Sequence, residues 1–198
     1  QPELSSILEQ IGRGSFFSRR STAIEMEEYE TIIREISGAA AVLSRNNVGA
    51  LIVLTKETGI VEYLDSGVHL DALVSANLLT NIFVPNSPLH DGAVVISEGR
   101  IYKAACFLPL SDNPNLDKEL GTRHRAGVGI TELSDALSLI VSEETGTISL
   151  AKEGELRRYL DPQSLVDILG EEMISDVKWS DSWKKRWRIE FRKREEKE

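Results

Sequence analysis

Hydrophobic residues follow two patterns along this chain, one with the period of a helix and one in short unbroken runs. Across residues 22–44, apolar side chains recur about every 3.6 residues with glutamates on the opposite face, which predicts an amphipathic helix. Ser21 or Thr22, followed by Glu25, resembles a capping box at its start. Residues 48–54 carry no polar side chain, which predicts a strand buried on both faces. These two elements indicate a central sheet covered by helices.

The rest of the chain adds hairpins and short helices around this sheet. Two antiparallel hairpins are predicted, one from residues 92–96 and 101–108 and one from residues 137–141 and 147–150. Further helices are predicted over residues 71–81 with Asp71 as the cap, from residue 121 onward, and over residues 156–160 and 164–172. The predicted fold class is therefore α/β, with a mixed central β-sheet flanked by helices.

We divide the chain into three segments. Residues 1–21 are interpreted as an N-terminal linker helix, residues 22–172 as one domain, and residues 173–198 as a charged helical tail with one stripe of tryptophans (Trp179, Trp183, Trp187). Residue 1 is Gln and not Met, so we expect that a preceding segment has been removed. The longest apolar runs fall far short of the roughly 20 residues that a membrane-spanning helix needs, so we expect this fragment to be soluble.

Charge is distributed unevenly along the sequence. The formal net charge is −9, although residues 178–198 hold nine Lys or Arg against five Asp or Glu. Nonspecific nucleic-acid binding needs clustered cations over a broad face, and the acidic remainder of the chain argues against it. A phosphorylated ligand must therefore be bound by a small local group of residues and not by a broad basic face. The single cysteine, Cys106, lies in an apolar run, which predicts a buried thiol in a reducing compartment.

His90-Asp91-Gly92-Ala93 is the first candidate for chemistry. It follows a loop with two prolines and enters an apolar strand, so it places an imidazole and a carboxylate beside a glycine at a sheet edge. Such a carboxylate can bind a divalent cation or accept a proton from a hydroxyl, as nucleotidyl transfer requires. The same residues also fit a simple Asp-Gly turn, and the pattern alone leaves both interpretations open.

Gly121-Thr122-Arg123-His124-Arg125 is the second candidate, because it puts a hydroxyl and two guanidinium groups at a helix start. Free backbone N–H groups and the helix dipole attract anions there, and arginine binds phosphate in a bidentate manner. The alternative is a solvated basic turn that pairs with the acidic body. His124 sits between the two arginines, and packing and catalysis are both open for it.

A third candidate, Ser142-Glu143-Glu144-Thr145-Gly146, offers a hydroxyl and two carboxylates for phosphate and metal, and it fits an ordinary hairpin turn equally well. The chain lacks a Gly-x-x-x-x-Gly-Lys-Ser/Thr loop, a Gly-x-Gly-x-x-Gly motif, a Cys-x-x-Cys motif and a Gly-x-Ser-x-Gly motif. These absences remove support from kinase-like, dinucleotide-binding, zinc and serine-hydrolase interpretations.

Four segments together resemble the diadenylate cyclase domain family. They are Leu89 to Ala93, Cys106 to Ser111, Leu120 to Ala126, and Val141 to Gly146, and the resemblance runs from about residue 23 to residue 169. The joint presence of Asp91-Gly92-Ala93 and Arg123-His124-Arg125 is more specific than either motif alone. Within the family the chain is most similar to the membrane-anchored CdaA-type enzymes, as a catalytic domain without its transmembrane region.

The resemblance implies an enzyme that condenses two ATP into cyclic di-AMP and two pyrophosphates. It implies a divalent metal, Mn²⁺ or Mg²⁺ with Co²⁺ as a further option, and a homodimer or higher assembly whose two domains face each other. It also implies attachment to the cytoplasmic face of a bacterial membrane through the missing N-terminal region, a regulatory membrane protein and a phosphoglucosamine mutase as partners, and no nucleic-acid ligand. The alternatives are a catalytically silent adenine-nucleotide sensor and an interaction domain that acts through its tail.

The family motifs also imply roles for individual residues. Catalytic roles fall on Asp91, Gly92, Ala93, Arg123, His124 and Arg125, with Asp91 orienting or deprotonating the ribose 3′-hydroxyl. His90 and Asp91 would hold the metal. Gly121, Thr122, Arg123, Ser142 and Glu143 would line the phosphates, while Phe107 would stack on adenine and the Leu108 backbone would bind its edge. Many relatives have Tyr where this chain has Phe107.

Overall fold

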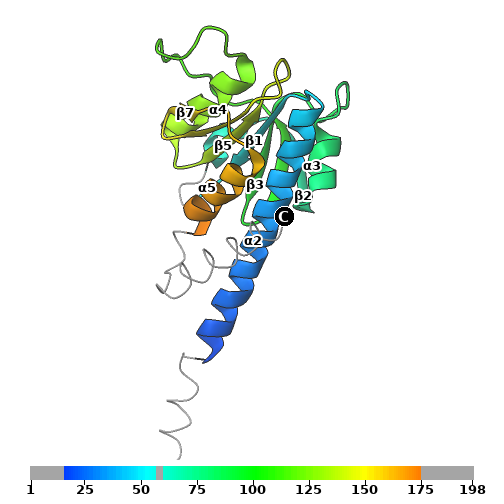
Figure 1. Ribbon diagram of the computed structural model, residues 1–198, viewed down its shortest axis with the longest axis vertical. Coiled ribbons are helices and arrows are strands. Elements are labelled where there is room, and N and C mark those ends of the chain that lie inside the picture. The colour runs from blue at the N-terminus through cyan, green and yellow to red at the C-terminus, as the bar shows by residue number, and fades with distance from the viewer. Residues whose placement is uncertain (1–15, 57–59, 175–198) are drawn as a thin grey trace, which may run out of the picture.

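The computed structural model describes residues 16–56 and 60–174, and these form a seven-stranded sheet with helices on both faces (Figure 1). The strands are β1 (Ala50–Leu54), β2 (Val68–Leu73), β3 (Ala93–Ser97), β4 (Arg100–Cys106), β5 (Leu137–Val141), β6 (Ile148–Lys152) and β7 (Glu155–Arg157). The helices are α2 (Phe16–Arg45), α3 (Ala76–Ile82), α4 (Thr122–Leu133) and α5 (Pro162–Ile174), with a short 3₁₀ helix at Val61–Tyr63. The sheet order is β2-β4-β3-β1-β5-β6-β7.

The sheet is mixed, as predicted. Strands β1 and β3 are parallel, whereas the other neighbouring pairs are antiparallel. The predicted hairpins form as β3–β4 and β5–β6. This arrangement confirms the α/β class with a mixed central sheet.

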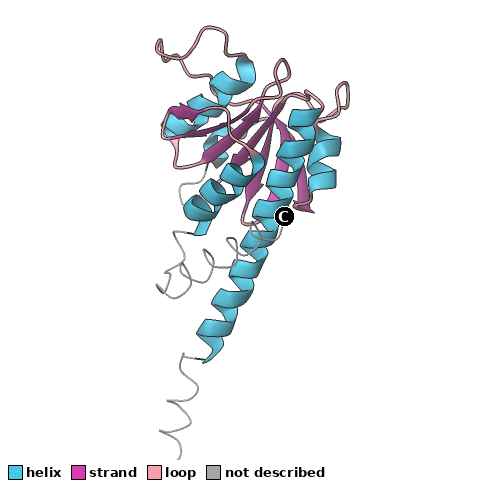
Figure 2. Cartoon of the chain, viewed as in Figure 1, coloured by secondary structure: helices cyan, strands magenta, loops and turns pink. Residues whose placement is uncertain are grey.

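Strand β1 is buried along its whole length because both faces of the sheet are covered. Ile52 and Leu54 belong to a core shared with α2, α3 and α5, while Leu51 and Val53 belong to a second core shared with α4. Figure 2 shows α2 and α5 lying across the front of the strands. Alternate side chains of a strand point to opposite faces, so a strand between two helical layers needs an apolar residue at every position.

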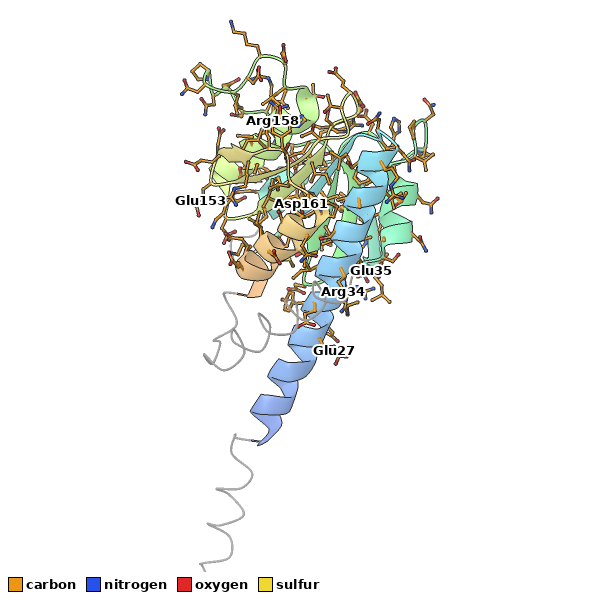
Figure 3. All side chains as sticks on the ribbon, viewed as in Figure 1. Glu27, Arg34, Glu35, Glu153, Arg158 and Asp161 are labelled. Carbon is orange, nitrogen blue, oxygen red and sulfur yellow. The ribbon has the colours of Figure 1, made fainter. Side chains whose placement is uncertain are left out.

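Polar groups at the helix starts hold the front layer in place. Glu35 of α2 accepts a hydrogen bond from the backbone N–H of Ala76 at 2.6 Å, and Ser75 is the N-cap of α3. Asp161 accepts hydrogen bonds from the N–H groups of Gln163 and Ser164 at the start of α5 (Figure 3). Such acceptors satisfy amides that have no partner within the helix.

Three details of the predicted elements are wrong. The helix predicted over 22–44 has already begun at Phe16, so Ser21 and Thr22 do not cap it. The helix predicted from Asp71 is confined to Ala76–Ile82. Asp71 instead lies in edge strand β2 with φ 47°, and its carboxylate binds Arg100 at 2.6 Å. The helix predicted over 156–160 is also wrong, because this region begins with edge strand β7.

Four chain segments meet at one end of the sheet. Strands β1 and β3 are parallel, so their starts, next to Gly49 and Gly92, lie at the same end. Strands β4 and β5 run the opposite way, so their C-terminal ends join them there, with Cys106 opposite Ala93 and Val141 opposite Ala50. We call this the catalytic end of the sheet, because Asp91, which the sequence predicts to be catalytic, lies next to Gly92 there. Helix α2 finishes at the same end, where Ser44 Oγ donates to the Gly146 carbonyl at 2.6 Å.

The remaining expectations concern the two ends of the chain, membrane-spanning helices and Cys106. Residues 1–15 of the expected linker helix and the tryptophan stripe of the tail lie outside the described residues. The expected boundary between residues 21 and 22 falls within α2. Among residues 16–56 and 60–174, no helix has the length and apolar character required to cross a bilayer. Cys106 is buried, as expected, with 1% of its surface exposed.

Candidate active site

Arg123 lies at the centre of the catalytic end and connects three of its segments. It is in the first turn of α4, and its Nη1 donates to Glu143 Oε2 at 2.7 Å across the β5–β6 turn. Its Nη2 reaches the His90 carbonyl at 3.5 Å, immediately before Asp91. The structure therefore brings together all three candidate motifs, which lie far apart in the sequence.

His90 is fixed in one tautomer by its own loop. Its Nδ1 lies 2.6 Å from the Ser87 carbonyl oxygen, which can only accept, so Nδ1 carries the proton and donates it. In this tautomer of the neutral ring, Nε2 carries the lone pair that can bind a cation, and a carbonyl partner on the other nitrogen is the usual support of a metal-binding histidine. Asp91, the next residue, is exposed at the start of β3. These two side chains are the donors with which the chain could hold a metal here.

Among the described residues, no group of three or more His, Cys, Asp and Glu side chains could hold a metal ion. The two donors at His90 and Asp91 are fewer than a protein-only cage requires. They suit an ion that keeps water and takes most of its ligands from phosphate oxygens, as Mg²⁺ does in nucleotide sites.

Gly92 is required by the backbone on which it packs. Its φ is 112°, and a Cβ atom there would lie 2.8 Å from the Cys106 carbonyl oxygen and 2.9 Å from the Ala105 carbonyl carbon. Ala105 itself has φ 54° within a stretch where the β3–β4 register shifts. Two residues of β4 lie opposite one residue of β3 here, so this is a β-bulge of β4 beside the start of β3.

The start of α4 is open to an anion. Its N-cap, Gly121, makes no side-chain hydrogen bond, so the first-turn amides receive no capping oxygen from it. Thr122 is exposed at the first helical position. The helix is placed by two glycines further along, because a Cβ at Gly127 would meet Ile140 of β5 at 2.9 Å and one at Gly129 would overlap the Pro109 carbonyl.

Ser142 shapes the β5–β6 turn. Its Oγ accepts from the N–H groups of Glu144 and Thr145 at 3.3 and 3.4 Å, and the Gly146 N–H donates to its carbonyl at 2.9 Å. The turn predicted from the sequence therefore exists, and it also brings Glu143 onto Arg123. The Ser142 hydroxyl proton has no acceptor in these bonds and can be donated to a ligand.

Phe107 is the exposed aromatic group of this end, with 64% of its surface accessible. Its N–H donates to Ser66 Oγ at 2.8 Å, which fixes the backbone at the end of β4. Leu108 is buried in the core beneath α4. An apolar ring held open to solvent is suited to stacking on a base.

His124 takes a different position from Arg123. His124 is buried, and its Nε2 finds no hydrogen-bond partner among the described residues. Burial, with a smaller contribution from the nearby Arg158 cation (Figure 3), lowers the pKa of His124, so its imidazole is neutral at pH 7. The Arg125 carbonyl accepts from the Ser111 N–H at 2.9 Å. The structure therefore places His124 in the interior, where it packs behind the helix start.

The sequence pattern missed several residues that build this end. Ser87 and Ser66 orient His90 and Phe107, Ser44 supports the β5–β6 turn, and Gly49 lies beneath the Arg123–Glu143 pair. Small residues in loops carry no distinctive pattern. Only the proximity of Ser87 to His90, within one proline-bearing loop, gave any signal.

This end of the sheet combines the amides of a helix start, an arginine held in place by Glu143 and an exposed aromatic ring. These groups suit a phosphorylated, aromatic ligand. They define the protein class as a nucleotide-binding α/β domain. Comparison with known proteins gives the family. Residues 37–156 match the DAC family profile, described as DisA bacterial checkpoint controller nucleotide-binding. The chain belongs to this family of diadenylate cyclases, which confirms the resemblance seen in its motifs.

Two curated relatives cover most of the chain. It is 47% identical over 188 residues to the cyclic di-AMP synthase CdaA of Bacillus subtilis. The aligned residues make up 95% of this chain and 68% of that protein. It is also 47% identical over 175 residues to a diadenylate cyclase of Listeria monocytogenes, spanning 88% of this chain and 64% of the relative. The chain thus spans about two thirds of the length of these relatives.

Solved structures support the fold. A crystal structure of a double mutant of DacA from Staphylococcus aureus aligns with a TM-score of 0.72 and 46% identity, covering 74% of this chain and 97% of that one. A structure described as a hypothetical membrane spanning protein from Bacillus cereus aligns with a TM-score of 0.62 and 46% identity, covering 63% and 61%.

Proposed function

We propose that this chain condenses two molecules of ATP into cyclic di-AMP and two pyrophosphates, with a divalent metal and two domains facing each other. The observation that carries the proposal is the position of Arg123, which joins the helix start suited to phosphate to the loop that bears Asp91. A phosphate-binding group and a proton acceptor are thereby held at one end of the sheet. The names of the relatives, cyclic di-AMP synthase and diadenylate cyclase, support the same reaction.

In this proposal the nucleotide lies along the catalytic end of the sheet. Phe107 stacks on adenine, and the Leu108 backbone binds the base edge. The guanidinium of Arg123, the first-turn amides and Thr122 of α4, and the Ser142 hydroxyl hold the triphosphate. Each of these groups donates, so together they favour an anion over a neutral ligand.

The proposed reaction is two identical displacements. The 3′-oxygen of each ribose forms a bond to the α-phosphorus of the opposite ATP, while the bond from that phosphorus to the bridging oxygen breaks and pyrophosphate leaves with the electron pair. Asp91 orients the 3′-hydroxyl and accepts its proton. Gly92 lets the chain that follows Asp91 pass close to the backbone at the end of β4.

His90 Nε2 and the Asp91 carboxylate would hold the metal, with phosphate oxygens completing its ligands. When bound, the metal neutralises charge on the phosphates and on the departing pyrophosphate. Mn²⁺ and Co²⁺ accept both imidazole and oxygen donors, whereas Mg²⁺ prefers oxygen and would depend chiefly on Asp91 and the phosphates, and we propose each as a candidate.

One domain supplies groups for one ATP, whereas the product joins two. We therefore propose a face-to-face pair of domains that brings the 3′-hydroxyl of one nucleotide to the α-phosphate of the other. Membrane attachment of the whole protein, a regulatory membrane protein and a phosphoglucosamine mutase remain predictions from the family resemblance.

The test is to incubate the purified chain with ATP and each metal and to quantify cyclic di-AMP and pyrophosphate by chromatography. We expect two pyrophosphates for each cyclic di-AMP, and a rate per protein molecule that rises with protein concentration. Hydrolysis of ATP without cyclic product, or no turnover at high protein concentration with any of the metals, would overturn the proposal. Nucleotide binding without turnover would favour the sensor function instead.

A further inference from the structure

Gly49 is a buried glycine that no candidate motif contains. It lies between the Val48 N–H, which donates to the Leu43 carbonyl at 2.9 Å, and the first residue of β1. Its φ is outside the left-handed region, so the backbone conformation there is open to any L-residue. Something other than backbone conformation must account for a glycine at this position.

The space beside Gly49 is filled by the ion pair of the proposed site. A Cβ atom on Gly49 would lie 2.6 Å from Arg123 Nη1 and 2.9 Å from Glu143 Oε2. Both atoms take part in the 2.7 Å bond between these side chains. The guanidinium and the carboxylate therefore meet in the space that a side chain on residue 49 would occupy.

We propose that Gly49 is a positioning residue, whose lack of a side chain sets where the Arg123 guanidinium stands relative to the triphosphate. Three groups surround the guanidinium: the Glu143 carboxylate, the His90 carbonyl and the backbone of Gly49. The Arg123 side chain is 22% exposed, so it has little room to move except towards the ligand. This inference rests on the proposed function, because it assumes that Arg123 meets phosphate.

A methyl group at position 49 should displace Arg123 without unfolding the protein, since the atoms that it meets first are the ends of flexible side chains. We expect Gly49→Ala to weaken ATP binding by about tenfold, the size of one lost phosphate contact. Adenosine has no phosphate, so its affinity should stay within about twofold. The matched control is Gly38→Ala in α2, where the added Cβ makes an ordinary 3.7 Å contact with Ala76 and both affinities should be unchanged.

The displacement itself can be measured without nucleotide. Arg123 Nε is buried without a hydrogen-bond partner among the described residues, so its N–H signal in an NMR spectrum reports on local packing, and Arg123→Lys assigns it by its disappearance. We expect this signal to shift in Gly49→Ala and to stay in place in Gly38→Ala. An unmoved signal, or a moved signal with unchanged ATP affinity where the wild type binds ATP, would overturn the inference.

Two further outcomes separate this inference from the proposed function. If the wild type fails to bind ATP, the proposed function falls, and the NMR signal alone decides whether Gly49 positions Arg123. If Gly49→Ala fails to fold, the double variant with Arg123→Ala should fold, because removal of the guanidinium frees the space. A double variant no more stable than Gly49→Ala would overturn the inference.

Discussion

Gly92→Ala should destabilise the fold itself, whether or not a ligand is bound. The φ of 112° lies outside the left-handed helical region that L-residues tolerate, and such backbone strain costs roughly 1–3 kcal/mol. The added Cβ would also lie 2.8 Å from the Cys106 carbonyl, a fixed backbone atom, and overpacking of this kind costs about 1–3 kcal/mol more. We therefore expect a loss of about 2–6 kcal/mol, out of the roughly 5–15 kcal/mol typical of a domain.

The assay is equilibrium unfolding in urea without nucleotide, with thermal unfolding as a check. A loss of about 3 kcal/mol, within this range, lowers the melting temperature by about 6–12 °C for a protein of this length. Gly38→Ala should instead raise stability by up to about 1 kcal/mol, since alanine is favoured over glycine within a helix. If the free energy of unfolding of Gly92→Ala lies within about 1 kcal/mol of the wild-type value, the backbone explanation is refuted. Close approach of a ligand then becomes the reason for the glycine.

Three further predictions concern single side chains. Asp91→Asn should lower turnover by about 10²-fold or more, because the variant keeps the shape of the side chain and loses its basicity. ATP affinity, measured by calorimetry, should stay within about threefold of the wild type. Full turnover would remove Asp91 from the mechanism. The folded-state pKa of His124 is lower than its unfolded value, so its neutral form stabilises the fold above about pH 6.5, and this contribution should be lost as the pH falls below that value. The stability advantage of the wild type over His124→Gln should therefore shrink between pH 8 and pH 5 in urea titrations, and a constant difference would contradict it. Burial raises the pKa of Cys106 to about 11, so a thiol reagent at pH 8 should label it only after urea is added, and rapid labelling of the folded protein would show that the thiol is accessible.

The interior of the fold could be predicted from sequence because burial leaves a strong pattern. Strand β1 is covered on both sides and carries only apolar residues, and α2 has one apolar face. The edge strands β2 and β7 were missed because half or more of their residues are exposed, which leaves no apolar run to detect. At β2, Asp71 has the composition of a helix cap, yet its tertiary partner is Arg100.

The candidate site was predicted as three separate motifs, and the structure supplies the contacts between them. The bond from Arg123 to Glu143 depends on the position of the β5–β6 turn against α4, which no local pattern encodes. The backbone at Gly92 packs on atoms of β4, a contact between segments that the Asp91-Gly92-Ala93 motif does not encode. His124 shares a motif with Arg123 but points into the core, because successive residues of a helix face different directions.

Helix α2 separates the two ends of the domain. It runs for 30 residues, about 45 Å, and finishes at the catalytic end, so its start lies well away from the residues of the proposed site (Figure 1). A sensor chip or bead that captures the protein at the start of α2 would leave the catalytic end facing solution. Immobilised copies should therefore still take up nucleotide, while a dense layer held in one orientation would keep two such ends from meeting. Capture geometry could thus separate nucleotide binding from product formation in a single instrument.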